Sequence, residues 1–334
     1  MKSSIVAYKP LPADVLAWLR ERAQVVEVNA AQPGALVAAL AGADGAIGSG
    51  VPITAAMLER APRLKALSTI SVGYDPFDVA DLTRRGIVLT NTPDVLTEST
   101  ADTVFALILA TARRVVELAD WVRAGHWQTS LGPAQFGVDV QGKTLGIVGL
   151  GRIGGAVARR AALGFNMSVL YANRSPNPAA EQQYGARRVE LHALLENADF
   201  VCLQVPLSDA TRHLIGAREL RMMKPGAILI NAARGPVVDE AALVAALQDG
   251  TLRAAGLDVF ETEPLAAASP LLRLPNVVAL PHIGSATHET RHAMARCAAE
   301  NLVAALDGTL HRTPDGRFDA ALARNVVNRE VLAR

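Results

Sequence analysis

The chain has 334 residues, 50% of them hydrophobic, and 33 basic against 32 acidic side chains give a formal net charge of +1. This length suggests about two domains, each with enough apolar side chains for a packed core. No long block carries one sign of charge, so nothing indicates a nucleic acid or a membrane surface as a partner. The 2 cysteines are too few for a disulfide framework and fit a reducing compartment.

The start of the chain, Met1 to Pro10, interrupts a short apolar run with charge and does not resemble a secretory signal. No apolar run approaches the roughly 18 residues that a membrane-spanning helix needs. We therefore expect a cytoplasmic protein.

Short apolar runs alternate with helical stretches along the whole chain, which is the pattern of parallel sheets covered by helices on both faces. Strands are expected at residues 5–8, 45–47, 66–69, 87–89, 145–148, 168–171, 200–205, 227–230, 255–259 and 277–280. Residues 97–125 contain no Pro and no internal Gly and predict one long helix that ends at Gly125. Residues 287–306 predict the last clear helix, and the charged tail beyond it predicts an irregular extension with a short helix at 319–324.

The most informative motif follows the apolar strand at 145–148, where three glycines are spaced as G-x-G-x-x-G before a helical stretch. In this context Gly149 permits a tight turn, Gly151 lets the backbone approach a pyrophosphate, and Gly154 allows the helix to pack closely on the strand. The amino end of that helix then faces the negative charge. The motif predicts dinucleotide binding, and about a hundred residues before it form a separate α/β unit, so the substrate is expected between the two domains.

The next expected strand, residues 168–171, is followed by Ala172, Asn173, Arg174 and Ser175. An NAD-specific site usually places an acidic residue here to bind the ribose hydroxyl, and none is present. Arg174 can pair with a 2′-phosphate instead. The sequence therefore favours NADP(H), with NADH used more weakly.

Three later segments place polar residues at or after the carboxyl ends of expected strands, where open α/β sheets bind ligands. Arg234 follows the strand at 227–230, and His282 follows the strand at 277–280. Asp258 lies at the end of the strand between them, and Glu263 lies in the loop beyond. Taken singly each is an ordinary polar side chain, but together they predict one catalytic crevice.

These segments, with Thr69 to Asp75, Gly235 to Glu240 and His282 to Arg291, resemble the D-isomer-specific 2-hydroxyacid dehydrogenase family from Met1 to about Leu306. The resemblance implies two doubly wound parallel-sheet domains. One is a Rossmann-type cofactor domain at residues 98–287. The other is a flavodoxin-like substrate domain made of residues 1–97 and 288–334. It also implies an NADPH-dependent reductase of glyoxylate, hydroxypyruvate or 2-ketogluconate, and a homodimer whose interface is the 97–125 region.

The same resemblance implies a catalytic set of Arg234, Glu263 and His282. Reduction of a 2-oxo acid needs a hydride at C2 and a proton on the carbonyl oxygen, and an imidazolium can supply that proton near neutral pH. A carboxylate at Glu263 favours the protonated ring and orients it. Arg234 polarises the carbonyl and holds the substrate carboxylate.

Further site residues are implied by the family likeness. The backbone amides of Val72 and Gly73 receive the substrate carboxylate, Ser285 assists there, Thr100 lies near the nicotinamide, and Asp258 binds its carboxamide. The remaining residues expected to line the cofactor are Arg152, Ile153, Pro206, Thr211, Ala232, Ala233 and Gly284.

Two other classes of protein remain open. Residues 288–292 match the zinc motif H-E-x-x-H, but the positions of a third ligand hold Ala295 and Ala298, so no metal site is expected. The family also includes corepressors that sense nicotinamide nucleotides without catalysis. Fold alone does not exclude that role, but the three catalytic groups favour an enzyme.

Overall fold

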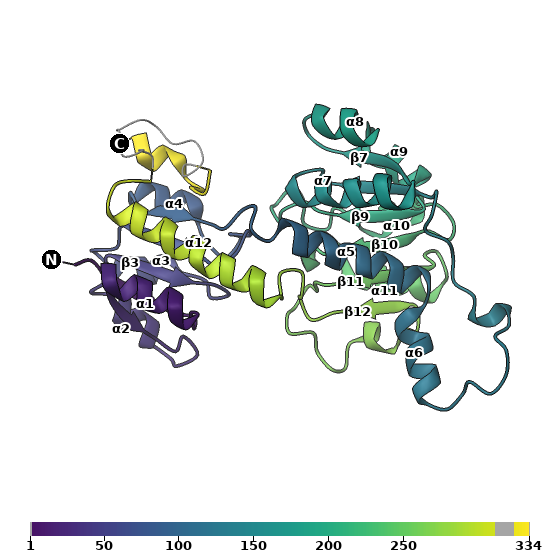
Figure 1. Cartoon of the computed structure of the whole chain (residues 1–334), viewed down its shortest axis with the longest axis horizontal. Coiled ribbons are helices and arrows are strands. Elements are labelled where there is room, and N and C mark those ends of the chain that lie inside the picture. The colour runs from purple at the N-terminus through teal and green to yellow at the C-terminus, as the bar shows by residue number, and fades with distance from the viewer. Residues whose placement is uncertain (1, 311–323, 334) are drawn as a thin grey trace. The chain divides into compact units, whose positions relative to one another are not determined.

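The computed structural model describes residues 2–310 and 324–333 (Figure 1). They form two compact units. Unit 1 is the described part of residues 1–96 and 287–334, and unit 2 is residues 97–286. The short helix expected at 319–324 lies outside the described residues except for Arg324.

Unit 1 contains one parallel sheet flanked by helices. Its strands are β1 Ser4–Ala7, β2 Gln24–Glu27, β3 Gly45–Gly48, β4 Ala66–Thr69 and β5 Val88–Thr90. Its α-helices are α1 Ala13–Arg22, α2 Ala35–Leu40, α3 Ala55–Glu59, α4 Val79–Arg84 and α12 His288–Leu306. The strand order is β2-β1-β3-β4-β5, with every pair parallel, which is the flavodoxin-like order.

The helix expected at 287–306 is present as α12, which begins after Thr287, whose hydroxyl accepts the Thr290 amide at 3.1 Å. It packs on β3, β4 and β5 through a buried face that includes Ala298 and Leu302. The described end of the chain extends this sheet: Val326 pairs antiparallel with Thr90. Helix α12 thus covers one face of the unit 1 sheet, and the bridge to Val326 lies at the β5 edge.

Unit 2 contains a larger sheet. Its strands are β6 Thr144–Val148, β7 Ser168–Ala172, β8 Arg187–Arg188, β9 Phe200–Leu203, β10 Ile228–Asn231, β11 Ala254–Leu257 and β12 Val277–Ala279. Its α-helices are α5 Thr97–Ala112, α6 Val115–Arg123, α7 Arg152–Arg159, α8 Pro178–Tyr184, α9 Leu191–Asn197, α10 Ala217–Met222 and α11 Glu240–Gln248.

The unit 2 sheet is parallel throughout, in the order β12-β11-β10-β9-β6-β7-β8. This is the Rossmann order with one added strand, and the direction of strand succession reverses between β6 and β9. Ligands of such sheets bind at the carboxyl ends of the strands near this reversal. The predicted fold class, two parallel α/β sheets of Rossmann and flavodoxin type, is confirmed.

The long helix expected at 97–125 is wrong in one respect, because the structure forms two helices, α5 and α6. Arg114 between them adopts a left-handed φ of 56°, and the Ala112 carbonyl accepts the Val138 amide at 2.8 Å instead of continuing the helix. Gly137 makes this approach possible, since a Cβ there would lie 2.4 Å from the Ala112 oxygen. Gly125 has the predicted left-handed terminating conformation, with φ of 77°.

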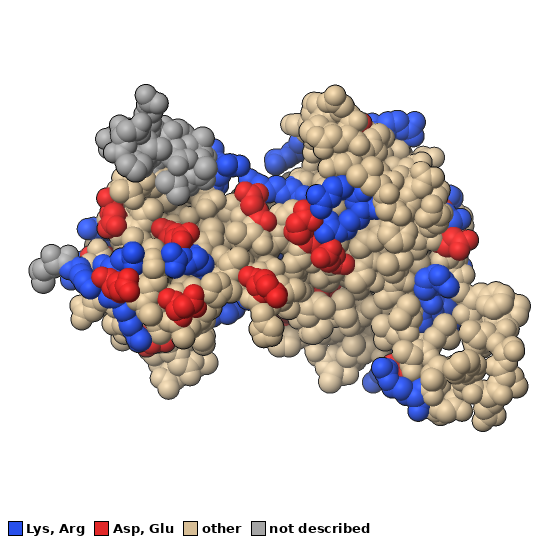
Figure 2. Space-filling view, in the orientation of Figure 1, with Lys and Arg blue, Asp and Glu red and all other residues tan. Residues whose placement is uncertain are grey.

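The surface of the molecule carries both signs of charge side by side on the face shown in Figure 2, as the net charge suggests. Among the described residues, no helix has the length and apolar character required to cross a lipid bilayer.

Candidate functional site

The glycine turn after β6 has the geometry that a dinucleotide requires. Gly149 has φ of 100°, and a Cβ there would lie 2.7 Å from the Gln204 carbonyl carbon, so only glycine fits. A Cβ at Gly154 would lie 2.4 Å from the Gly149 oxygen, which is the close helix-to-turn packing that the motif predicts. Gly151, by contrast, faces open space.

The amino end of α7 is suited to a phosphate. No side chain caps its first amides at Gly151, and the open space at that glycine lets an anion approach them. Arg152 and Ile153 are the first residues of the helix. These residues fit a dinucleotide pyrophosphate.

Asn173, expected at the adenosine ribose, forms hydrogen bonds with the backbone of the glycine turn at Leu150. Its side chain accepts the Leu150 amide at 2.7 Å and donates to the Leu150 carbonyl at 3.3 Å. The neighbouring Arg174 and Ser175 are exposed and available to a ligand. A second amide, from Asn177, also donates to the Leu150 carbonyl at 3.1 Å.

Arg188 is a residue that the sequence reasoning missed. It lies on β8, and its guanidinium donates to the Asn173 carbonyl at 2.9 and 3.1 Å and to the Arg174 carbonyl at 3.0 Å. It therefore adds a positive charge to the loop that holds Arg174 and fixes that loop. No local pattern marks Arg188, because β8 is a two-residue exposed strand whose pairing with β7 brings it there.

The loop after β9 contains Pro206 and Thr211, both expected at the cofactor. The Thr211 hydroxyl donates to the Pro206 carbonyl at 2.6 Å and accepts the Ser208 amide at 2.8 Å, so it closes the loop on itself. Ala232 and Ala233 follow β10 on the adjacent strand. The structure thus places these four residues at the carboxyl ends of two neighbouring strands.

Arg234, Glu263 and His282 follow three adjacent strands, β10, β11 and β12. His282 Nδ1 lies 2.7 Å from Glu263 Oε2, and the Phe260 amide donates to Glu263 Oε1 at 3.1 Å. With Nδ1 engaged, Nε2 is the ring atom that remains for a substrate. The structure therefore brings the expected histidine and carboxylate into direct contact.

The surroundings of Glu263 shift the pKa of its carboxyl group in opposing directions. Burial raises its pKa, but the hydrogen bond from His282, the Phe260 amide and the charges of His282 and Arg234 outweigh that effect. The net result is a pKa below the ordinary value for glutamate. Glu263 is therefore ionised at neutral pH, and the charge of Arg234 helps to lower its pKa.

The backbone at Arg234 is held by the side chain of Asn231 and by the packing of Gly235. Asn231 donates to the Arg234 carbonyl at 3.0 Å and accepts the Ala233 amide at 3.1 Å. The next residue, Gly235, packs against Phe260 so closely that a Cβ would lie 1.8 Å from the Phe260 carbonyl carbon. The loops after β10 and β11 are thereby held together, which keeps Arg234 near Glu263.

Asp258 organises the loop that carries His282. Its two carboxylate oxygens accept the Ile283 amide at 2.7 Å and the Gly284 amide at 2.8 Å. Burial raises the pKa of Asp258, and these two amides offset that rise only in part. The residue expected at the nicotinamide carboxamide thus also holds the backbone beside the histidine.

Thr100 and Gly284, two further cofactor candidates, are neighbours. A Cβ at Gly284 would lie 3.3 Å from the Thr100 methyl carbon, and the Ser99 hydroxyl donates to the Gly284 carbonyl at 2.9 Å. Ser285 is the next residue and is partly exposed. Val72 and Gly73 lie in unit 1, after β4, where Asn91 donates to the Val72 carbonyl at 2.8 Å.

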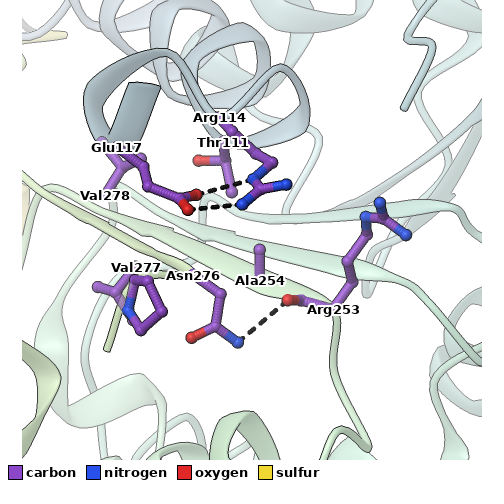
Figure 3. Close-up of a pocket in the computed structure, with 9 residues that line it drawn as sticks. Thr111, Arg114, Glu117, Arg253, Ala254, Asn276, Val277 and Val278 are labelled. Atoms are coloured by element: carbon purple, nitrogen blue, oxygen red, sulfur yellow. Dashed lines mark hydrogen bonds and ion pairs between the residues drawn. The ribbon is translucent and has the colours of Figure 1, made fainter. Parts of the chain in front are cut away.

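Two hollows in unit 2 differ in their relation to these residues. One is lined by Gly151, Arg152 and Asn177 at the amino end of α7, beside the glycine turn. The other, shown in Figure 3, is lined by residues such as Ala254 and Val277. These begin β11 and β12, so the second hollow lies at the end of the sheet opposite to Arg234, Glu263 and His282.

The H-E-x-x-H segment forms the first turns of α12, where His292 Nε2 lies 2.8 Å from Asp14. Ala295 and Ala298, at the third-ligand positions, are buried in the core. Within residues 2–310 and 324–333, no three His, Cys, Asp or Glu side chains gather as a metal-binding group. His292 thus forms a pair with a carboxylate of α1.

Comparison with known proteins gives a consistent result. The model of the family "D-isomer specific 2-hydroxyacid dehydrogenase, NAD binding domain" matches residues 105–284. Glyoxylate/hydroxypyruvate reductase B of Yersinia enterocolitica is 59% identical over 314 residues, which are 93% of this chain and 96% of that protein. The protein of the same name from Klebsiella pneumoniae is 56% identical over 315 residues, 93% of this chain and 98% of its own length.

A solved structure of similar fold is the NADPH-dependent glyoxylate/hydroxypyruvate reductase of Sinorhizobium meliloti in complex with NADP and malonate. It is 37% identical, with a TM-score of 0.81, over 91% of this chain and 93% of that chain. The identity, the coverage and the family model agree with the resemblance inferred from the motifs. The chain belongs to the D-isomer-specific 2-hydroxyacid dehydrogenase family.

Proposed function

We propose that the chain is an NADPH-dependent reductase that converts small 2-oxo acids to D-2-hydroxy acids, with glyoxylate, hydroxypyruvate and 2-ketogluconate as substrates. The observation that carries the proposal is the 2.7 Å contact between His282 and Glu263 beside the charge of Arg234. Relatives more than half identical carry the glyoxylate/hydroxypyruvate reductase B name.

The mechanism assigns one task to each side chain. Bound NADPH supplies the hydride that reduces the substrate C2. His282 donates a proton from Nε2 to the carbonyl oxygen, while Glu263 holds the ring through Nδ1. Arg234 stabilises the charge that develops on that oxygen and binds the substrate carboxylate, together with the backbone amides of Val72 and Gly73.

The preference between NADPH and NADH is determined by the loop after β7. Arg174 and Ser175 are exposed, no acidic residue stands at the position of a ribose ligand, and Arg188 fixes the loop through three hydrogen bonds. A 2′-phosphate therefore meets positive charge and hydroxyl donors, which favours NADPH over NADH. The NADP complex of the Sinorhizobium enzyme supports the same preference.

Two further parts of the proposal concern the surroundings of the protein. We assign it to the cytoplasm, since both cysteines are free, as in a reducing compartment. We also assign a homodimer formed through α5, α6 and the loop after them, where several large apolar side chains are exposed.

The test replaces His282 by Gln and, separately, by Asn, because Asn tolerates the left-handed φ of 56° at this position. Both variants should lose at least about a hundredfold in kcat, the usual contribution of a general acid. The dissociation constant of NADPH, measured by fluorescence titration, should stay within about twofold of the parent value.

Equal losses of turnover and NADPH affinity in both variants would mean that His282 supports the fold of the site. The parent protein is assayed with each of the three substrates and with both nicotinamide cofactors. Stoichiometric NADPH binding without oxidation of the cofactor by any substrate would favour a nucleotide-sensing corepressor.

A further inference from the structure

Unit 1 holds two cations at one edge of its sheet. Lys9 stands two residues after the end of β1, and its ammonium donates to the Ser49 hydroxyl at 2.9 Å, directly after β3. Arg291, in the first turns of α12, is close enough to lower the pKa of Lys9, although burial of the ammonium is the larger cause. Two positive charges therefore share a small region of one unit.

This pair has no compensating acid. Among residues 2–310 and 324–333, no carboxylate forms an ion pair with Lys9 or Arg291, and Asp14 on α1 is paired with His292. Arg291 is exposed, but Lys9 is partly buried, and a partly buried ammonium beside a second cation and without a counter-charge raises the free energy of the folded state. Such an arrangement at the carboxyl edge of a parallel sheet is typical of a ligand site.

The position relative to the substrate loop follows from the sheet order. β3 lies between β1 and β4, and the Ile70 amide donates to the Gly48 carbonyl at 2.8 Å, so the loop leading to Val72 starts beside Ser49. Adjacent strands are about 5 Å apart. The Lys9 ammonium, at Ser49, therefore lies about one strand spacing from the start of that loop.

We propose that Lys9, Ser49 and Arg291 form a subsite for the oxygen-rich tail of 2-oxo acids with five or six carbons. The proposal rests on the assignment of the C1 carboxylate to the amides of Val72 and Gly73. The Lys9 ammonium, bonded to Ser49 after β3, lies at the same carboxyl end of the sheet as the loop after β4 that carries those amides. The ammonium, the guanidinium and the hydroxyl all donate hydrogen bonds, so the tail is one that presents acceptor oxygens, either hydroxyls or a carboxylate.

The experiment measures kcat/KM with NADPH for three substrates: glyoxylate, which has no tail, 2-ketogluconate, with a hydroxylated tail, and 2-oxoglutarate, with a carboxylate at its end. For each tailed substrate we take the ratio of its kcat/KM to that of glyoxylate. Replacing Lys9 by Met should lower this ratio by about tenfold or more, as expected for loss of a charged hydrogen bond. Arg291→Met should lower the same ratio. The substrate that shows the fall identifies the tail as a hydroxyl chain or an acid.

The control is Lys2→Met, which removes the same charge at the opposite end of β1, where the exposed Lys2 donates to the Arg20 carbonyl. Its ratios should match the parent. Lys9→Arg retains a donor and should recover most of the loss, which separates a binding role from a packing role. If Lys9→Met does not fold, Arg291→Met and Lys9→Arg decide the matter.

The inference is overturned if both tailed ratios stay within twofold of the parent in these variants, or if the parent reduces glyoxylate but neither tailed substrate. The first outcome leaves the proposed function intact, and the second removes only 2-ketogluconate from its substrates. A parent that binds NADPH and reduces none of the three substrates would instead overturn the proposed function.

Discussion

The backbone at His282 adopts a left-handed φ of 56°, which is uncommon for a residue with a side chain. Three hydrogen bonds hold it there: its own amide donates to the Leu280 carbonyl at 3.0 Å, and the next two amides donate to Asp258. The strained conformation is thus maintained by a buried carboxylate one strand away. It directs the imidazole toward Glu263.

Replacing Glu263 by Gln keeps a hydrogen-bond acceptor for His282 Nδ1 but removes the charge. We expect kcat for reduction to fall about a hundredfold, within the range for disturbed acid–base catalysis. Glu261→Gln is the matched control, because Glu261 lies in the same loop as Glu263 and is also 2.7 Å from a histidine, His213. A control as inactive as Glu263→Gln would contradict the assignment.

The lowered pKa of Glu263 sets the direction of its pH effect. A carboxylate whose pKa is lower in the folded state stabilises the fold above its unfolded pKa, and this contribution disappears as pH falls through the folded value. The difference in free energy of unfolding between parent and Glu263→Gln should therefore be constant above pH 4.5 and shrink below it. Urea titrations at several pH values check this, and a difference that grows in acid would be inconsistent with it.

Arg188 is the residue on which we expect cofactor preference to depend. Replacing it by Ala frees the Asn173 and Arg174 carbonyls and removes a charge, so KM for NADPH should rise about tenfold, in the range for hydrogen bonds to a charged group. KM for NADH, which has no 2′-phosphate, should change less than about twofold, and the steady-state rates with both cofactors measure the contrast.

Arg187, the preceding residue of β8, provides the control for that measurement, because it is exposed on the other face of the strand. Arg187→Ala should resemble the parent with both cofactors. An equal rise in KM for NADPH and NADH in Arg188→Ala would show that Arg188 merely supports the loop.

At this scale, spacing and residue type predicted which side chains follow β10, β11 and β12, and His282 and Glu263 do meet. They did not predict that Asp258 holds two amides or that Arg188 supports the Arg174 loop. Both contacts join segments far apart in the chain, and neither produces a periodic pattern in the sequence. Such contacts depend on strand pairing, which only the three-dimensional structure fixes.

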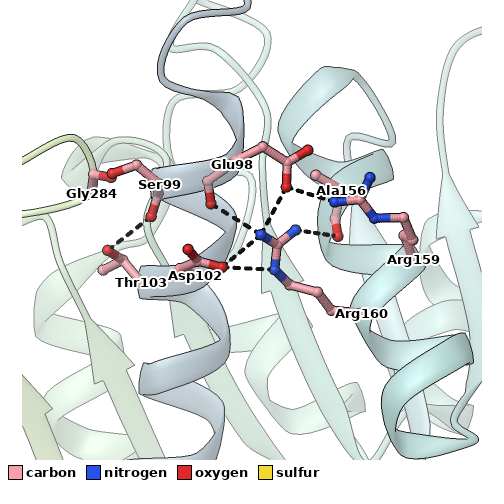
Figure 4. A network of polar contacts seen from close by, with 8 residues as sticks. All are labelled: Glu98, Ser99, Asp102, Thr103, Ala156, Arg159, Arg160 and Gly284. Atoms are coloured by element: carbon pink, nitrogen blue, oxygen red, sulfur yellow. Dashed lines mark hydrogen bonds and ion pairs between the residues drawn. The ribbon is translucent and has the colours of Figure 1, made fainter. Parts of the chain in front are cut away.

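Helices α5 and α7 are joined by a network of ion pairs, shown in Figure 4. Arg160, just after α7, bonds Asp102 through two nitrogens at 2.6 and 2.9 Å and lies 2.8 Å from Glu98. The side chain of Arg160 is only 21% exposed, but Asp102 and Glu98 are 70% and 57% exposed, so solvent still screens these ion pairs.

Replacing Arg160 by Met should lower the free energy of unfolding of unit 2 by about 1 kcal/mol, the upper end of the range for exposed ion pairs. Arg159→Met is the control, since Arg159 makes a single contact with Glu98 and is 46% exposed. Urea unfolding of the full chain measures both, and the difference should narrow in high salt. Equal stability of the two variants would show that the network adds nothing.

The elements that sequence patterns predicted best are the buried ones. β2 and β8 were missed because they are short edge strands with mostly exposed residues: β2 has only two apolar residues and β8 has none. Residues 97–125 carry an uninterrupted helical pattern, yet the contact of Gly137 and Val138 with Ala112 ends α5 early. In this region a tertiary contact overrides the helical propensity of the local sequence.

At the scale of the whole molecule, the most conspicuous feature is an apolar surface on α6 and the segment that follows it. The exposed fractions are 51% for Val115, 46% for Val122, 63% for Trp127 and 56% for Phe136. Residues 126–138 contain no Lys, Arg, Asp or Glu, and Figure 2 shows this segment almost without charged colour. Large exposed apolar groups concentrated in one place are typical of a protein interface.

A second copy of the chain is the partner we expect at this surface, since most oligomers are symmetric dimers in which one patch faces its own copy. The parent should therefore have a solution mass twice its 35.2 kDa, and Trp127→Lys combined with Phe136→Lys should give the single mass, because a buried, unpaired charge opposes association. Leu163→Lys, which alters an apolar side chain 70% exposed outside this surface, should leave the parent mass unchanged. Light scattering after size-exclusion chromatography distinguishes these cases, and a parent that remains at 35.2 kDa across micromolar concentrations would exclude the dimer.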